Sequence, residues 1–182
     1  MSGPTGVGTS FPEKQIDPAP LLKTLEALSD EYLRRAIEIA VANVEDGRGG
    51  PFGAVVVCEE RIIATGANRV VPSNDPTAHA EVAAIREACR ILNRFQLDDC
   101  AIYTSCEPCP MCLGAIYWAR LREVYFAASR EDAAAAGFDD SLIYNEIPLA
   151  PGDRRIGMRY VPCPDAAAPF RAWAGKLDRI PY

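Results

Sequence analysis

Histidine is almost absent from this chain, because His79 is the only one among 182 residues. No apolar run approaches the ~20 residues that a membrane-spanning helix needs, so we expect no membrane partner. The N-terminus has no basic stretch followed by an apolar one, and we therefore expect no secretory signal and a cytoplasmic protein. No internal repeat is evident, and this length predicts a single domain.

Basic residues are also fewer than acidic ones. Lys and Arg number 19 against 25 Asp and Glu, which gives a net charge of −6. Proteins that bind nucleic acids usually carry a basic face that displaces counterions from phosphates. We therefore expect no nucleic-acid partner.

The seven cysteines belong to a chain for which export is not expected. Disulfides are rare in reducing compartments, so most of these residues should be reduced thiols or metal ligands. Four of them are interpreted as small apolar residues: Cys58, Cys89, Cys100 and Cys163.

Residues 1–20 are rich in Gly, Pro, Ser and Thr and predict a flexible tail, which leaves residues 21–182 as the folded domain. Apolar residues at helical spacing predict a first helix through residues 33–44, capped by Ser29 or Asp30 and ended by Gly47. Further elements follow: a hairpin of residues 54–58 and 61–65, helices at 78–92, 110–119 and 130–136, and strands at 101–104 and 123–127. Residues 137–164 are expected to be irregular.

The alternation of strands and helices implies crossover connections and a partly parallel sheet covered on both faces. This pattern predicts an α/β fold. Near the C-terminus, an apolar stripe of Phe170, Trp173, Ala174 and Leu177 predicts a helix that packs on its own subunit or on a neighbour.

Two short segments carry the chemistry. Residues 77–81 read Thr-Ala-His-Ala-Glu, and residues 105–112 read Ser-Cys-Glu-Pro-Cys-Pro-Met-Cys. One imidazole and two thiolates, from His79, Cys109 and Cys112, make three zinc ligands and leave a fourth tetrahedral position for water or hydroxide. We predict one Zn²⁺ per subunit.

Glu81 lies two residues from His79, where a carboxylate could handle the protons of that water. A positioned carboxylate acting as general acid and base typically contributes about 10²–10⁴-fold to a rate. These residues together are suited to a hydrolysis in which hydroxide is the attacking group and Glu81 moves the protons.

Less specific interpretations compete. A Cys-x-x-Cys pair alone is often a redox pair or half of a structural zinc site, and His79 could be an ordinary buried histidine. Cys106 extends the run to three cysteines, which could complete a closed zinc site or indicate iron–sulfur ligation. Pro108 argues against both, because it breaks the helical phase between Cys106 and Cys109 and assigns Cys106 to the end of a strand.

The arrangement H-x-E followed by P-C-x-x-C resembles the cytidine-deaminase-like superfamily of zinc deaminases. Residues 74–81, 103–117 and 137–140 resemble bacterial guanine deaminases in particular, and the likeness covers roughly residues 30–182. The resemblance implies a three-layer α/β/α sandwich with a central mixed five-stranded sheet, and hydrolysis of guanine to xanthine and ammonia.

The same resemblance implies roles for further residues. Asn68 would hydrogen-bond the purine, and the Ala80 backbone would contact its carbonyl edge. Phe52 and Trp118 would pack on its ring. A second set of roles is implied for the C-terminal half: Asp140 as a second acid, and the final residue Tyr182 as a substrate contact. The subunits would form a homodimer in which residues of about 165–182 are exchanged.

Other functions stay open at this point. A related zinc deaminase could act on guanosine, cytosine or adenosine in tRNA, although the acidic charge weighs against tRNA. A zinc-stabilised binding protein without activity is the alternative of a different class, and it would give Glu81 no purpose.

Overall fold

The computed structural model describes residues 18–181, and the interpretation of residues 1–17 as a tail therefore lies outside it. Within the described residues, no helix is both long and apolar enough to cross a membrane. The elements through the sheet are α1 (Pro18–Glu45), β1 (Gly53–Cys58), β2 (Arg61–Ala67), α2 (Val70–Ser73), α3 (Ala80–Leu92), β3 (Cys100–Cys106), α4 (Pro110–Ala119) and β4 (Glu123–Ala128). The chain then continues through α5 (Arg130–Ala135), α6 (Ser141–Glu146), the 3-10 turn η1 (Pro151–Asp153) and α7 (Ala168–Gly175).

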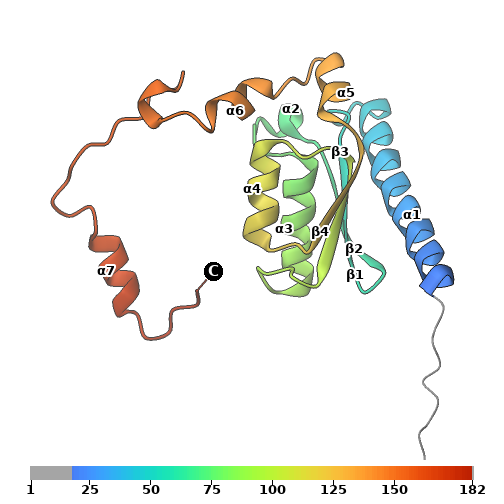
Figure 1. The fold of residues 1–182 in the computed structure, drawn as a ribbon, viewed down its shortest axis with the longest axis horizontal. Helices are drawn as coiled ribbons and strands as arrows, with labels where there is room; N and C mark the ends of the chain where they lie inside the picture. The colour runs from blue at the N-terminus through green and yellow to red at the C-terminus, as the bar shows by residue number, and fades with distance from the viewer. Residues whose placement is uncertain (1–17, 182) are drawn as a thin grey trace, which may run out of the picture.

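The described residues form one mixed sheet of four strands in the order β2-β1-β3-β4. The predicted hairpin pairs β1 with β2, β1 also pairs antiparallel with β3, and β3 pairs parallel with β4. The α/β class is thus confirmed, but the expected fifth strand is not present in the described part of the chain. After α5 the chain leaves β4 instead of returning alongside it (Figure 1).

Helices cover both faces of the sheet, as the alternation predicted (Figure 1). On one face α1 packs through Tyr32 and Ala36 against Val55, Val57 and Tyr103. On the other face α3 and α4 bury a larger apolar cluster that includes Val56, Ile85, Ala88, Leu97, Ile102 and Ile116. Every residue of β1 and β3 is buried, so these two central strands fix the positions of the helices around them.

Three predictions of secondary structure were wrong. The first helix begins at Pro18 and not after Ser29 or Asp30, which fits the good helix formers between them and the suitability of Pro for a first turn. Residues 137–164 contain α6 and η1 and are not wholly irregular. Residues 68–75, which the sequence predicts as a polar loop, contain the short helix α2.

Two cysteines also behave differently from the prediction. Cys58 and Cys100 form a disulfide, whereas both were interpreted as reduced apolar residues. They face each other in the β1–β3 register, with Cα atoms 4.3 Å apart. That proximity depends on pairing between strands 42 residues apart in the sequence, which local patterns do not reveal.

The C-terminal arm, residues 141–181, extends away from the sheet, and α7 stands apart from the rest of the subunit (Figure 1). None of its residues is buried, and several large apolar side chains are strongly exposed: Ile156, Tyr160, Val161, Phe170 and Leu177. The predicted amphipathic helix is present, but its apolar stripe has no buried position within this subunit.

Candidate active site

Two helix N-termini meet at the carboxyl end of β3. His79 is the N-cap of α3, with extended backbone angles, and its carbonyl accepts the Ala83 amide at 3.0 Å. The helix was predicted to begin at residue 78 with His79 in its first turn, but it begins at Ala80, so His79 lies one residue before it. The preceding loop is held by Asp75, whose carboxylate accepts the amide and the hydroxyl of Thr77 at 2.8 and 2.7 Å. These contacts hold the loop that leads into His79 and α3.

The second helix starts as its prolines predicted. Cys109 is the N-cap of α4, Pro110 occupies the first helical position, and Cys112 follows in the first turn. The Cys109 carbonyl accepts the Leu113 amide at 2.8 Å, which closes that turn. Both sulfurs consequently lie at the start of α4.

The three predicted ligands converge. The His79 Nδ1 atom lies 3.5 Å from the Cys109 sulfur and 3.4 Å from the Cys112 sulfur, and all three ligand atoms lie within 4.8 Å of one another. Zn–S bonds of about 2.3 Å and Zn–N bonds of about 2.0 Å at tetrahedral angles separate nitrogen and sulfur by about 3.5 Å. The distances and the donor set therefore fit a tetrahedral zinc ion.

The two cysteines of the cluster have pKa values shifted in opposite directions. A hydrogen bond from Cys112, together with the His79 ring, lowers the pKa of Cys109 to about 4 against the opposing effect of burial. The same shared hydrogen bond raises the pKa of Cys112, because a second thiolate beside the first is unfavourable. A divalent cation bound to both sulfurs would compensate the second charge, as metal ligation requires.

Glu81 lies in the first turn of α3 and is 7% exposed. Burial is the main cause that raises the pKa of its carboxyl group, and the nearby Cys109 acts in the same direction. A buried carboxyl group with a raised pKa is a better proton acceptor than an ordinary exposed carboxylate, and it can return the proton. Its position beside the ligand cluster is thus suited to general acid–base catalysis.

Cys106 is not part of the ligand cluster, as Pro108 indicated. It ends β3, is buried, and its thiol donates a hydrogen bond to the Ser129 carbonyl at 3.4 Å. Burial raises the pKa of this thiol to about 11, so it stays protonated at neutral pH. Cys106 would have been the fourth ligand of a closed zinc site or of an iron–sulfur site, and the structure supports neither interpretation.

A cavity of about 710 Å³ opens over the cluster. It brings together six of the predicted site residues: Phe52, Asn68, His79, Glu81, Cys109 and Asp140. Trp118 does not line it; this residue lies on α4 with 70% of its surface exposed. Tyr182 lies outside the described residues.

Ala80 is the first residue of α3, and its N–H therefore has no acceptor within the helix. Its carbonyl lies against β2, where a Cβ added to Gly66 would be only 2.1 Å from the oxygen. Gly66 thus permits β2 to approach the start of α3 closely. Ala80 is 1% exposed and is not among the residues that line the cavity, so its predicted contact with the purine stays a prediction.

Asn68 is held in place by hydrogen bonds with the loop before β1, a contact that the sequence did not predict. Its Oδ1 atom accepts the amides of Gly50 and Val70 at 3.4 and 3.3 Å. Buried Asn43 on α1 donates to the carbonyls of Gly50 at 2.9 Å and Asn68 at 2.8 Å. The only local signal was the double glycine before Pro51: a Cβ on Gly49 would lie 2.0 Å from the Asn68 carbonyl oxygen.

The two adjacent acids after Phe138 have different surroundings. Asp139 accepts the Ser141 amide at 2.9 Å and so serves the start of α6, whereas Asp140 makes no capping hydrogen bond. Burial raises the pKa of Asp140, with a further contribution from Cys109. Phe138 packs edge-on against Phe52, with ring centroids 5.0 Å apart, and forms an apolar wall beside Asp140.

Comparison with known proteins agrees with this geometry. Residues 27–128 match the cytidine and deoxycytidylate deaminase zinc-binding region. A guanine deaminase of Bacillus subtilis is 54% identical over 84% of this chain and 98% of its own length, and its X-ray structure superposes with a TM-score of 0.82. A structure of guanine deaminase from Nitrosomonas europaea is 38% identical, covers 60% of this chain and 63% of its own, and gives a TM-score of 0.56.

More distant relatives act on other substrates. A tRNA-specific adenosine deaminase of Aquifex aeolicus is 36% identical over 80% of this chain and 93% of its own length. These relatives share the region that supplies the ligand cluster and Glu81. The chain therefore belongs to the cytidine and deoxycytidylate deaminase zinc-binding family.

Proposed function

We propose that this protein is a zinc-dependent guanine deaminase that hydrolyses guanine to xanthine and ammonia. The observation that carries the proposal is the buried Glu81 carboxyl group beside the His79, Cys109 and Cys112 cluster, in a cavity that Asn68 and Asp140 also line. The 54% identity to a guanine deaminase over nearly its whole length supports guanine as the substrate.

His79 Nδ1 and the two thiolates would hold the zinc ion. When bound, zinc lowers the pKa of a coordinated water to about 7 and so makes hydroxide available at neutral pH. The chain's own contribution is to present all three ligands from two helix starts that the sheet holds in place.

Glu81 carries the protons. It accepts one from the attacking water and delivers it to the ring nitrogen beside the amino-bearing carbon. The raised pKa of its carboxyl group favours such exchange, because a carboxylate of higher pKa is a stronger base toward water. A further proton must reach the amine before ammonia leaves, in balance with the proton that the new hydroxyl group loses as it becomes a carbonyl. Asp140, which also lines the cavity, is suited to supply the proton to the amine.

Asn68 and Ala80 bind and orient the base. Backbone amides engage the Asn68 Oδ1 atom, which leaves its Nδ2 group as a donor to an acceptor atom of guanine. The Ala80 N–H would donate to the guanine carbonyl oxygen. The Phe52 and Phe138 rings supply an apolar wall for the purine.

A second subunit would complete the structure. β4 ends the sheet, and its outer edge is unpaired within residues 18–181. Ile156, Met158 and Tyr160 alternate with polar or small residues, a period-two pattern typical of a strand, and all three are exposed. We propose an exchange dimer in which the partner's arm supplies the fifth strand beside β4 and brings the partner's Tyr182 to the cavity.

The catalytic assignment is tested by Glu81→Gln, which keeps size and hydrogen bonding but cannot transfer protons. Ammonia release from guanine should fall by about 10²–10⁴-fold, as loss of a general acid–base group predicts, while zinc measured by atomic absorption stays at one per chain. Arg90→Gln on the exposed end of α3 is the control and should retain activity. Wild-type turnover by the Glu81 variant would contradict the assignment.

A further inference from the structure

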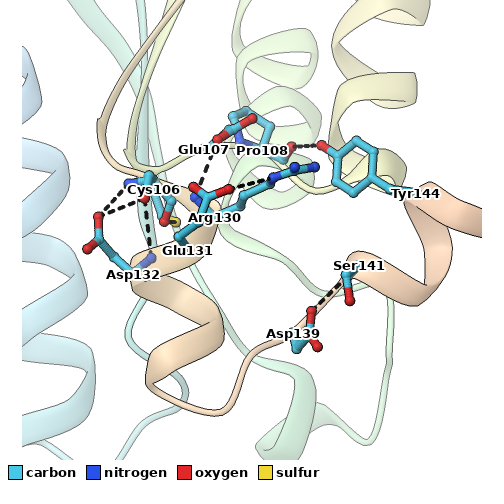
Figure 2. Close-up of polar contacts among 10 residues, drawn as sticks. Cys106, Glu107, Pro108, Arg130, Glu131, Asp132, Asp139, Ser141 and Tyr144 are labelled. Carbon is cyan, nitrogen blue, oxygen red and sulfur yellow. Dashed lines mark hydrogen bonds and ion pairs between the residues drawn. The ribbon is translucent and has the colours of Figure 1, made fainter.

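Two contacts join the segment that carries Cys109 to the helices after β4 (Figure 2), and a third joins it to the last residue of β4. The Glu107 amide donates to the Ala128 carbonyl at 2.9 Å, and its carboxylate accepts the Arg130 amide at 3.3 Å. From α6, the Tyr144 hydroxyl donates to the Pro108 carbonyl at 3.4 Å. The peptide that leads into Cys109 is therefore tied to both α5 and α6.

Arg130 and Tyr144 also contact each other. The Arg130 guanidinium lies over the Tyr144 ring, 4.9 Å from its centroid, which is a favourable cation–π arrangement. Arg130 reaches this position from the start of α5, where it also pairs with Glu131 at 3.1 Å (Figure 2). The contact therefore holds α6 close to α5, although the two helices share no buried apolar core.

Tyr144 belongs to the same helical turn as Asp140. The Asp140 carbonyl accepts the amides of Ile143 at 2.9 Å and Tyr144 at 3.3 Å. A displacement of Tyr144 would therefore carry the start of α6 with it. Asp139 and Ser141, on either side of Asp140, lie at that start in Figure 2.

We propose that Tyr144 and Arg130 are positioning residues, which act as a latch that holds Asp140 at a fixed distance from the Cys109 end of the ligand cluster. The proposal rests on the assignment of Asp140 as the second acid in the proposed function. The latch is needed because α6 is short and exposed, and because neither Asp139 nor Ser141 connects it to the rest of the site. Arg130 also lines the cavity, but its proposed role is to position Asp140 and does not involve contact with the substrate.

The test is a set of steady-state measurements on guanine with Tyr144→Phe, Tyr144→Leu, Arg130→Lys, Arg130→Met, Asp140→Asn and the double variant Tyr144→Leu/Asp140→Asn. Small displacements of catalytic groups lower rates steeply, so Tyr144→Leu should reduce kcat by about tenfold. KM should change by less than about twofold and zinc content should be unchanged, since the group that moves acts after binding. Arg130→Lys should recover part of the kcat that Arg130→Met loses, because it keeps the cation but not the planar stacking group.

The double variant separates positioning from general loosening. With Asp140→Asn already present, Tyr144→Leu should lower kcat by less than about twofold, because residues that act as a unit are non-additive. A full tenfold loss in that background, or a loss of zinc, would overturn the latch. Tyr144→Phe keeps the ring and should fold normally, and its predicted loss of about threefold is the readout if Tyr144→Leu is unstable.

Failure of the latch and failure of the proposed function give different results. If Asp140→Asn lowers kcat strongly while both Tyr144 variants behave like the wild type, the latch alone is wrong. If Asp140→Asn has wild-type kcat, the role of Asp140 falls and the latch falls with it.

Discussion

Asn43, near the C-terminal end of α1, donates a hydrogen bond of 2.8 Å to the backbone carbonyl of Asn68 and a second one of 2.9 Å to the backbone carbonyl of Gly50. The side chain is only 3% exposed. A helix on one side of the sheet thereby fixes the loop that carries a predicted substrate contact. Asn43 thus connects the packing of α1 to the shape of the cavity.

Replacement of Asn43 by Ala should therefore weaken binding of guanine. Leaving the buried Asn68 carbonyl without its donor costs about 1–3 kcal/mol, and the partly buried Gly50 carbonyl also loses its partner, so both stability and loop geometry should suffer. We expect a lower unfolding midpoint in urea and a raised KM, with kcat less affected. Asn145→Ala on the exposed face of α6 is the control, and an unchanged KM for Asn43→Ala would contradict the role.

Replacement of Cys112 by Ser should remove zinc and activity together. The sulfur is fully buried at the start of α4, and a serine hydroxyl does not become an anionic ligand at neutral pH. Zinc content should fall well below one per chain, and a chelator should inactivate the variant faster than the wild type. Cys163→Ser, at an exposed cysteine, should match the wild type. A fully loaded Cys112 variant would refute the ligand assignment.

The Cys58–Cys100 disulfide should contribute to stability and not to catalysis. It closes a loop of 42 residues, for which the chain-entropy relation predicts roughly 4 kcal/mol as an upper value. Cys58 ends β1 and Cys100 begins β3, whereas the site lies at the opposite ends of these strands. Reduction, or the pair Cys58→Ala/Cys100→Ala, should lower the free energy of unfolding and leave kcat/KM unchanged. Equal stability of the oxidised and reduced protein would contradict this.

The exchange dimer predicts complementation between two inactive proteins. Full-length Glu81→Gln subunits keep the C-terminus, and subunits without Tyr182 keep Glu81. Unfolded together and refolded, they should form heterodimers in which one site has both residues, so activity should reappear. A chain truncated after residue 154, which lacks the proposed strand and everything after it, should sediment as a monomer. No recovery of activity on mixing, with both proteins dimeric, would show that Tyr182 acts within its own subunit or not at all.

Local patterns were enough for the centre of the site. The ligands and Glu81 lie within a few residues of helix starts, and Pro110 marks one of those starts directly. Helical and strand periodicities likewise located the hairpin and the helices that flank the sheet. In these segments, residues that are close in the sequence are also close in space, so local patterns predict the structure.

The remaining features depend on contacts between distant segments. The pairing of Cys58 with Cys100 follows from strand register, and the role of Asn43 follows from a loop packed against the end of α1. Trp118 was predicted to pack on the substrate, yet it lies exposed on α4 in this subunit. The missing fifth strand has the same origin, because the direction of the chain after α5 is not set by local sequence.

The most direct test of the central claim is ammonia release by zinc-loaded wild-type protein given guanine, guanosine, adenine, cytosine and a tRNA anticodon stem-loop containing adenosine. The account predicts rapid release from guanine and little from the others, because Asn68, the Ala80 N–H and the Phe52 wall are matched to a free purine base that carries a carbonyl group. Turnover of guanosine or of the tRNA fragment in preference to guanine would contradict it.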